Sequence, residues 1–173
     1  LTRDYVLKVE GEKHGPVVLN IFGGKITTYR RLAEDVLEKL GAWFPQAKQP
    51  WTAGATLPGG DFPLDGHDAL VLSLRDDAPG LPKPVAERWA KAYGTRALQI
   101  AAGANSDADL GVYFGGGLYQ CEVEYLVRHE WAMTADDIMW RRTKVGLRLT
   151  EQEKSTLAQW LSDNYSGRTI HTA

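Results

Sequence analysis

The chain has 173 residues, of which 43% are hydrophobic and 24% charged, and its formal net charge is −2 at pH 7. This composition is ordinary for a globular protein, and the length suffices for one sizeable domain or for a domain with part of another. A nearly neutral charge excludes a broad electrostatic preference for nucleic acid. No apolar run approaches the ~18 residues of a membrane span, and no signal-peptide pattern opens the chain.

The first elements predicted are two strands. Residues 5–10 (YVLKVE) and 17–22 (VVLNIF) are rich in β-branched and aromatic side chains, and the polar stretch between them favours a β-hairpin. The chain opens at Leu1, directly before the first strand and without a Met. We therefore expect it to be cut from a longer protein.

A helix follows the hairpin. From Thr27 the apolar residues recur at helical spacing, which predicts an amphipathic helix that ends near Gly41. Asp35 and Lys39 are four residues apart on the outer face of this helix, and we expect them to form an ion pair.

The remainder of the chain is predicted to be helical after a linker. Residues 41–66 hold several prolines and glycines without periodicity, which indicates a linker or a long crossing loop. The predicted helices are 82–94, 95–102, 118–130, one capped by Thr134 and one that begins with the capping box of Thr150 and Glu153. The predicted fold class is therefore mainly α. A β-hairpin with a strand-turn-helix unit occupies residues 1–45, a linker 46–60, and an all-helical domain 61–173.

The sequence Gly23-Gly24-Lys25 joins the second strand to the helix. Two adjacent glycines permit positive φ angles and let another group approach the backbone closely. Thr27 and Thr28 stand at the helix start, where free amides and the helix dipole favour an anion, and Lys25 adds a positive charge. The turn is either a seat for a phosphate, a carboxylate or an electron-rich ring, or a tight turn with a threonine cap and a solvated lysine. Its spacing is not that of a Walker motif.

Four stretches occur in order along the chain: TRDYVL, FGGKITTYRRLAEDVLEKL, LPGG and VEYLVRHEWAMTADDIMWRRTKVGLRL. Together they resemble the C-terminal part of the FAD-dependent glycerol-3-phosphate dehydrogenases of the respiratory chain. The resemblance is strongest over residues 20–34 and 124–149 and loose over 61–117.

This resemblance implies that residues 1–45 are the end of an FAD-binding domain and that a C-terminal helical domain follows. It implies a parent enzyme that oxidises sn-glycerol 3-phosphate to dihydroxyacetone phosphate and passes electrons through FAD to a quinone. The parent would be a peripheral protein on the cytoplasmic face of the inner membrane. The GxGxxG of an FAD domain is not in this sequence, and FGGGLY (114–119) has the wrong spacing. We therefore expect this chain by itself neither to retain FAD nor to be active, with the missing FAD domain as its partner.

In this family the GGKxTTYR turn faces the flavin ring. Carried over, the resemblance assigns cofactor binding to Gly23, Gly24, Lys25, Ile26 and Thr27, and substrate binding to Arg3 and Lys25. An arginine suits a phosphate or a polarised hydroxyl because its planar fork offers paired donors. We name no catalytic acid or base in this chain, since the general base is expected in the missing part.

Three further features have competing interpretations. Cys121, the single cysteine, excludes an internal disulfide and fits a reducing compartment such as the cytoplasm; it is either a nucleophile or, as we favour, a half-buried helix residue. HEWAM (129–133) lacks the second histidine of a zinc helix, so we expect no metal. WRRTKVGLR (140–148) could contact phosphate or an anionic membrane, but Arg142 falls in an apolar stripe and is expected to pair with a buried carboxylate or with carbonyl groups.

Six tryptophans could suggest an aromatic binding platform, but Trp89 and Trp160 have helical core spacing and are expected to pack between helices. A function from another class also stays open at this point. It is a free-standing helical interaction domain that binds protein or membrane lipid.

Overall fold

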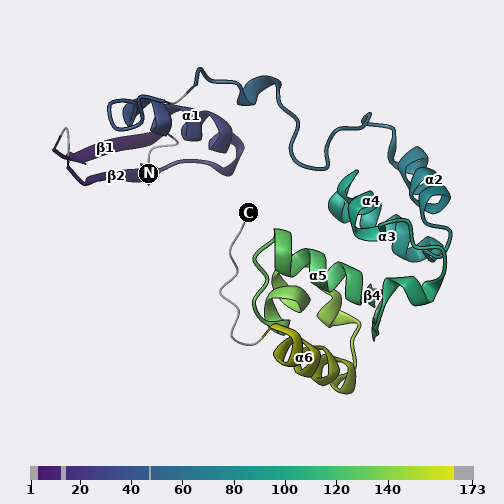
Figure 1. Cartoon of the computed structure of the whole chain (residues 1–173). Helices are drawn as coiled ribbons and strands as arrows, with labels where there is room; N and C mark the ends of the chain where they lie inside the picture. Colours follow the sequence, from purple (N-terminus) through teal and green to yellow (C-terminus); the bar gives the residue numbers. More distant parts are fainter. Residues whose placement is uncertain (1–3, 13–14, 47, 166–173) are drawn as a thin grey trace. The chain divides into compact units, whose positions relative to one another are not determined.

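The computed structural model describes residues 4–12, 15–46 and 48–165 (Figure 1). Arg3, one of the two predicted substrate-binding residues, lies outside these ranges. The chain divides into two compact units, Leu1–Thr56 and Leu57–Ala173. The predicted linker, residues 46–60, spans the boundary between them.

The first unit is the predicted hairpin followed by a helix. Strands β1 (Tyr5–Gly11) and β2 (Val17–Gly23) pair antiparallel, with Tyr5 opposite Gly23. A 3-10 turn, η1 (Ile26–Thr28), leads into α1 (Tyr29–Lys39), which contacts β1. A second 3-10 turn, η2 (Thr52–Gly54), lies near the end of the unit.

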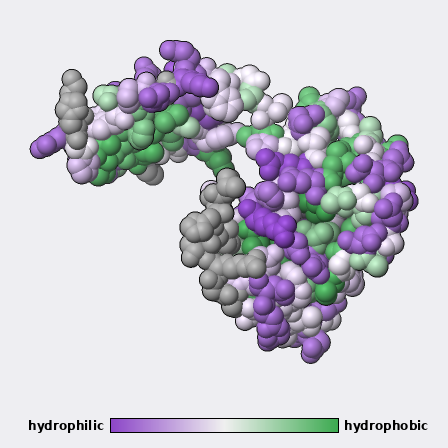
Figure 2. Space-filling view, viewed as in Figure 1, coloured by the Kyte–Doolittle hydropathy of each residue, from purple (hydrophilic) through white to green (hydrophobic). Residues whose placement is uncertain are grey.

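This unit has no core of its own. None of its described residues is buried, and the sheet carries exposed Val6, Val18 and Phe22, each more than half accessible to solvent. These three residues alternate with the half-buried positions, so they share the face of the hairpin that α1 does not cover. Figure 2 shows hydrophobic residues gathered over the hairpin. One helix on a two-stranded sheet cannot enclose a hydrophobic core.

The second unit consists mainly of helices packed around one hydrophobic core. Its largest fully buried apolar side chains are Leu74, Leu81, Trp89, Leu110, Phe114, Leu118, Leu126, Ile138 and Leu157. The α-helices are α2 (His67–Asp77), α3 (Lys83–Tyr93), α4 (Arg96–Ala101), α5 (Gln120–His129) and α6 (Glu151–Tyr165). Shorter turns of 3-10 helix are η3 (Asp107–Leu110) and η5 (Val145–Leu147), and η4 (Asp137–Arg142) is a π-helix. The mainly α class is confirmed.

The second unit also contains a small sheet that the sequence analysis did not predict. Strands β3 (Tyr113–Gly115) and β4 (Leu118–Tyr119) pair antiparallel, so α5 begins at Gln120 and not at 118. Gly115, Gly116 and Gly117 have φ angles of +97°, +57° and +82°, which lie in the left-handed region that glycine alone adopts readily. The FGGGLY sequence is therefore the tight turn of a hairpin and not a nucleotide-binding loop.

The predicted helix caps are present. At the start of α6, the Thr150 amide donates to the Glu153 carboxylate at 2.7 Å, and the Glu153 amide donates to the Thr150 hydroxyl oxygen at 3.3 Å. Thr134 and Asp137 make the same reciprocal pair at 2.9 and 3.2 Å. Within the described ranges, no helix is both long and apolar enough to cross a membrane.

Candidate functional site

The turn after β2 is the candidate site, and its backbone explains its two glycines. Gly23 has a φ of +82°, and a Cβ there would lie 2.7 Å from the carbonyl oxygen of Asp4, the residue directly before β1. Gly24 has a φ of +105°, again a conformation that other residues rarely adopt. Lys25 returns to extended backbone with a φ of −120°. Glycine is therefore required at both positions by the path of the chain itself.

Thr28 closes the turn, although not in the predicted way. Its amide and its hydroxyl both donate to the Lys25 carbonyl oxygen at 3.0 Å, and its side chain makes no cap of the α1 amides. The first amides of a helix have no acceptor inside the helix, so those that follow Lys25 can meet an external group at the positive end of the helix dipole. The turn thus keeps the features that suit an anion or an electron-rich ring.

The five predicted cofactor-binding residues, Gly23 to Thr27, form one continuous exposed surface. The Ile26 side chain is 88% accessible, which is unusual for a residue of this size and polarity. The Lys25 side chain is exposed at the same place. At Gly23 and Gly24 no side chain projects from this exposed backbone.

The turn is tied to α1 through Tyr5, which the sequence analysis did not single out. The Tyr5 hydroxyl donates to the Asp35 carboxylate, and this hydrogen bond raises the pKa of Tyr5 above its ordinary value. Asp35 forms an ion pair with Arg31 at 3.1 Å, whereas Lys39 was predicted as its partner. Arg31 is four residues before Asp35, towards the N-terminal end of α1. The two side chains therefore lie on the same face of the helix.

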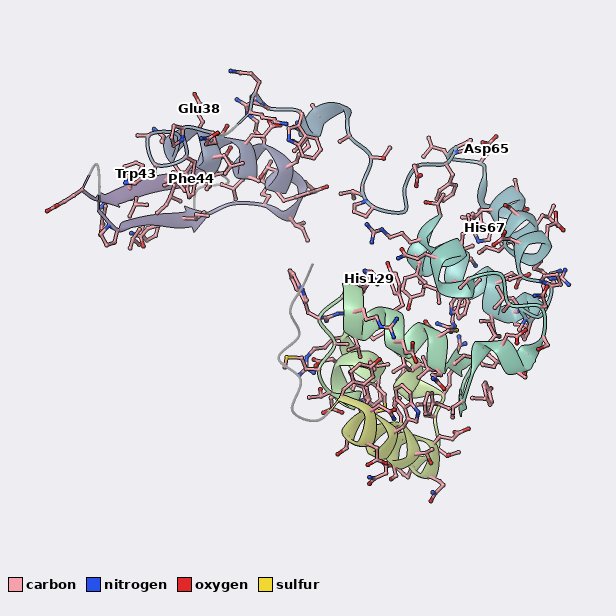
Figure 3. The ribbon with its side chains drawn as sticks, viewed as in Figure 1. Glu38, Trp43, Phe44, Asp65, His67 and His129 are labelled. Carbon is pink, nitrogen blue, oxygen red and sulfur yellow. The ribbon has the colours of Figure 1, made fainter. Side chains whose placement is uncertain are left out.

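The segment after α1 is fastened to the helix as well. The Thr52 hydroxyl donates to the Glu34 carboxylate, and Arg30 pairs with the same carboxylate at 3.0 Å. The hydrogen bond from Thr52, aided by the arginine, lowers the pKa of Glu34. In the loop between them, the Trp43 indole donates to the Glu12 carbonyl oxygen at 3.1 Å (Figure 3). Residues up to Thr52 thus belong structurally to the first unit.

The second unit contains a buried charged cluster that the sequence analysis also missed. Glu122 is fully buried and accepts hydrogen bonds from Arg88 at 2.7 and 2.5 Å and from the Tyr93 hydroxyl at 2.6 Å. Arg88 also donates to the Gly117 carbonyl oxygen at 2.7 Å, which joins α3 to the β3–β4 turn. Burial beside this carboxylate raises the pKa of Tyr93, so its hydroxyl remains a neutral donor. The sequence held one signal for this cluster. Glu122 directly precedes Val123, and both lie on the side of α5 that faces the core.

The other residues with competing interpretations resolve to structural roles. Cys121 is half-buried near the start of α5, and burial raises the pKa of its thiol to about 12, so a reactive thiolate does not form near neutral pH. Arg142 donates to the Glu130 carbonyl oxygen at 2.8 Å, as predicted for an arginine in an apolar stripe. Trp89 is fully buried, and Trp160 packs edge-on against Phe114 with ring centroids 5.5 Å apart. The predicted packing role of both tryptophans is confirmed.

The HEWAM segment (129–133) does not form the helix of a zinc site, because α5 ends at His129. His129, at the end of α5 (Figure 3), stacks on Tyr125 with ring centroids 4.9 Å apart. Among the described residues, no group of three or more histidine, cysteine or carboxylate side chains could hold a metal ion.

The described residues thus form a hairpin and a helix joined by an exposed glycine-lysine turn, followed by a mainly α unit. Over residues 50–164 the chain matches the family model described as the C-terminal domain of alpha-glycerophosphate oxidase. The chain belongs to this family.

Individual relatives agree with this assignment. The chain is 44% identical over its whole length to a glycerol-3-phosphate dehydrogenase of Pseudomonas aeruginosa, of which it covers 34%. It is 41% identical to the aerobic glycerol-3-phosphate dehydrogenase of Escherichia coli, over 93% of the chain and 32% of that protein. It is also 42% identical to the D-erythritol 1-phosphate dehydrogenase of Brucella abortus, over 94% of the chain and 32% of that protein. The chain thus spans about a third of the length of these relatives, and the family resemblance seen in the sequence is confirmed.

Proposed function

We propose that the chain works as the C-terminal third of an FAD-dependent glycerol-3-phosphate dehydrogenase, which oxidises sn-glycerol 3-phosphate to dihydroxyacetone phosphate. The observation that carries the proposal is the exposed turn from Gly23 to Thr27, in a chain 44% and 41% identical to glycerol-3-phosphate dehydrogenases. Electrons leave the enzyme to a quinone, and the enzyme is a peripheral protein on the cytoplasmic face of the inner membrane.

The described residues fit a flavin at this turn. Gly23 and Gly24 offer bare backbone, and the amides that follow Lys25 sit at the positive end of the α1 dipole. FAD, when bound, supplies the acceptor for the hydride of the substrate alcohol. The amides at the helix start favour the electron-rich end of its ring, while Lys25 and Arg3 hold the substrate phosphate and hydroxyl through their positive charges.

By itself the chain offers FAD only one wall of a site. Ligand pockets enclose most of a bound molecule, and a partial wall does not offset the entropy that a ligand loses on binding. We expect the purified 173-residue chain to contain no stoichiometric flavin and to show no dehydrogenase activity. Flavin absorbance that corresponds to one FAD per chain would contradict this expectation.

The proposal is tested on the complete product of the gene that encodes this chain. We expect stoichiometric FAD whose absorbance bleaches when sn-glycerol 3-phosphate is added without oxygen. A product without flavin would overturn the proposal and favour the alternative of a free-standing helical interaction domain.

A lysine variant tests the assignment of the turn. Lys25→Met should raise the KM for sn-glycerol 3-phosphate roughly tenfold or more, because a charge-assisted hydrogen bond to the phosphate is lost. Lys39→Met, at the exposed end of α1, is the matched control and should leave the KM unchanged. Equal KM values for Lys25→Met and the unaltered enzyme would remove Lys25 from the site.

D-erythritol 1-phosphate is a second candidate substrate. A dehydrogenase named for it is 42% identical to the chain, which falls between the two glycerol-3-phosphate dehydrogenases at 44% and 41%. The matched third of the protein therefore does not separate the two activities. Comparing kcat/KM for both phosphates in the complete gene product decides between them, and bleaching of the flavin by D-erythritol 1-phosphate alone would make it the substrate.

A further inference from the structure

Tyr5 lies at the junction of the three elements that form the candidate site. Its backbone pairs with Gly23 at the end of the hairpin. A Cβ built on Gly24 would lie 3.9 Å from the Tyr5 Cβ and 3.7 Å from the Leu32 Cδ2, so both side chains lie close to the backbone of the turn. The Tyr5 hydroxyl then reaches across to Asp35 on α1.

Asp35 is held in place from the other side. Arg31 contacts it at 3.1 Å, and the Asp35 side chain is only 25% accessible while that of Arg31 is 65% accessible. The carboxylate is therefore fixed between a tyrosine of β1 and an arginine of the same helix. None of the described residues of the first unit is fully buried, so polar contacts of this kind help to hold α1 on the hairpin.

We propose that Tyr5 and Asp35 are positioning residues for the turn from Gly23 to Thr27. The pair acts by holding the start of α1 against the end of the hairpin, which fixes the conformation of the two glycines and the direction of Lys25. Two consecutive glycines have much conformational freedom, so an unheld turn samples many states that cannot meet a ligand. The effect on a bound flavin rests on the function proposed above, whereas the effect on the turn does not.

The first test measures the turn itself in the ¹⁵N-labelled 173-residue chain. In Tyr5→Phe we expect the backbone order parameters of Gly24, Lys25 and Thr27 to fall from about 0.85 to below about 0.6. The amide shifts of Leu7 and Leu19 should stay unchanged, which shows that the hairpin is still paired. Unchanged order parameters in the turn would overturn the proposal.

A matched control comes from the second unit. Tyr119 donates to Asp107 at 2.7 Å, which is again a tyrosine hydroxyl bonded to a carboxylate. Tyr119→Phe removes an equivalent bond far from the turn in sequence and should leave the turn order parameters unchanged. An equal loss of order in both variants would overturn the proposal, because the effect would then be a general loss of stability.

Two substitutions at Asp35 keep the test decisive if Tyr5→Phe does not fold. Asp35→Asn retains an oxygen that accepts the Tyr5 hydroxyl hydrogen, so we expect the turn to keep most of its order. Asp35→Leu removes the acceptor, and we expect it to lose order as Tyr5→Phe does. Similar order parameters in the two variants would overturn the proposal.

The second test uses the apoprotein of the complete gene product and measures its FAD dissociation constant by titration. Tyr5→Phe should bind FAD about tenfold more weakly at a temperature well below melting, whereas the separate variant Asp35→Asn should retain most of the affinity. A disordered turn with unchanged FAD affinity would overturn the positioning role and leave the proposed function standing. No FAD binding by the unaltered protein would overturn the proposed function and leave the result on the turn standing.

Discussion

Glu122 of the second unit is a charged residue that is fully buried among hydrogen-bond donors. Its two oxygens accept from Arg88 and Tyr93, so the carboxylate is paired and neutralised inside the core. Breaking a buried pair by removing one partner is costly because the other charge stays behind without compensation. Arg88 therefore matters more for stability than its partial exposure, 21%, suggests.

Arg88→Met should lower the free energy of unfolding of the second unit by about 3–5 kcal/mol, because it leaves the Glu122 carboxylate buried and unpaired. Urea denaturation followed by circular dichroism measures this change. Arg128→Met is the matched control: its side chain is 64% accessible and pairs with Glu124 at 3.0 Å. A surface pair of this kind contributes about 0–1 kcal/mol. Equal losses in the two variants would contradict the buried role of Arg88.

At the scale of elements, local patterns predicted most of the structure. The hairpin strands, expected at 5–10 and 17–22, occupy Tyr5–Gly11 and Val17–Gly23, because alternation and turn residues are local signals. The β3–β4 hairpin was missed because its strands are too short for a period to show.

The turn was recognised as a candidate site from its glycines and lysine, which are adjacent in sequence. Its support by Tyr5 and Asp35 could not be predicted, since these residues are thirty positions apart and meet only when α1 lies on the hairpin. The same holds for Arg88 and Glu122, which are thirty-four positions apart. Contacts between distant residues depend on packing that no local pattern encodes.

The capping box of α6 gives the stability of this helix a dependence on pH. The Thr150 amide and hydroxyl donate to Glu153 and lower the pKa of its carboxyl below the ordinary 4.5. A lowered pKa in the folded state means stability that is present above the unfolded pKa and is lost as the pH falls through the folded one. Glu153→Gln lacks the carboxylate that accepts these hydrogen bonds, so its melting temperature should lie below that of the unaltered chain at pH 7. Since glutamine does not titrate, the difference between the two melting temperatures should narrow on acidification below about pH 4.5. A gap that stays constant from pH 7 to pH 3 would contradict this account.

At the scale of the whole molecule, the two units differ in how they are stabilised. Among the described residues, the buried hydrophobic ones all belong to the second unit, while the first unit is held by a strand ladder and by polar contacts. Local stability follows the density of buried apolar contacts. We therefore expect the two units to open independently and with different free energies.

Hydrogen exchange with mass spectrometry on the intact chain measures this difference. Peptides from Tyr5–Gly23 should exchange about a hundredfold faster than peptides from Gln120–His129, whose amides open only with the core. The ratio is taken after correction for intrinsic exchange rates. Equal protection of both segments, lost together in one transition as denaturant is added, would show instead that the chain unfolds as a single cooperative body.

The collision of a Cβ at Gly23 with the carbonyl oxygen of Asp4 has a consequence for how this sequence can drift during evolution. Because the chain path alone demands glycine there, a descendant that had lost its cofactor would still retain Gly23 and, through its positive φ, Gly24. Lys25 has an extended backbone and an exposed side chain, so folding places no such demand on it. In a lineage without catalysis the lysine would be replaced first, and the residue that follows the glycine pair therefore separates working enzymes from inactive descendants.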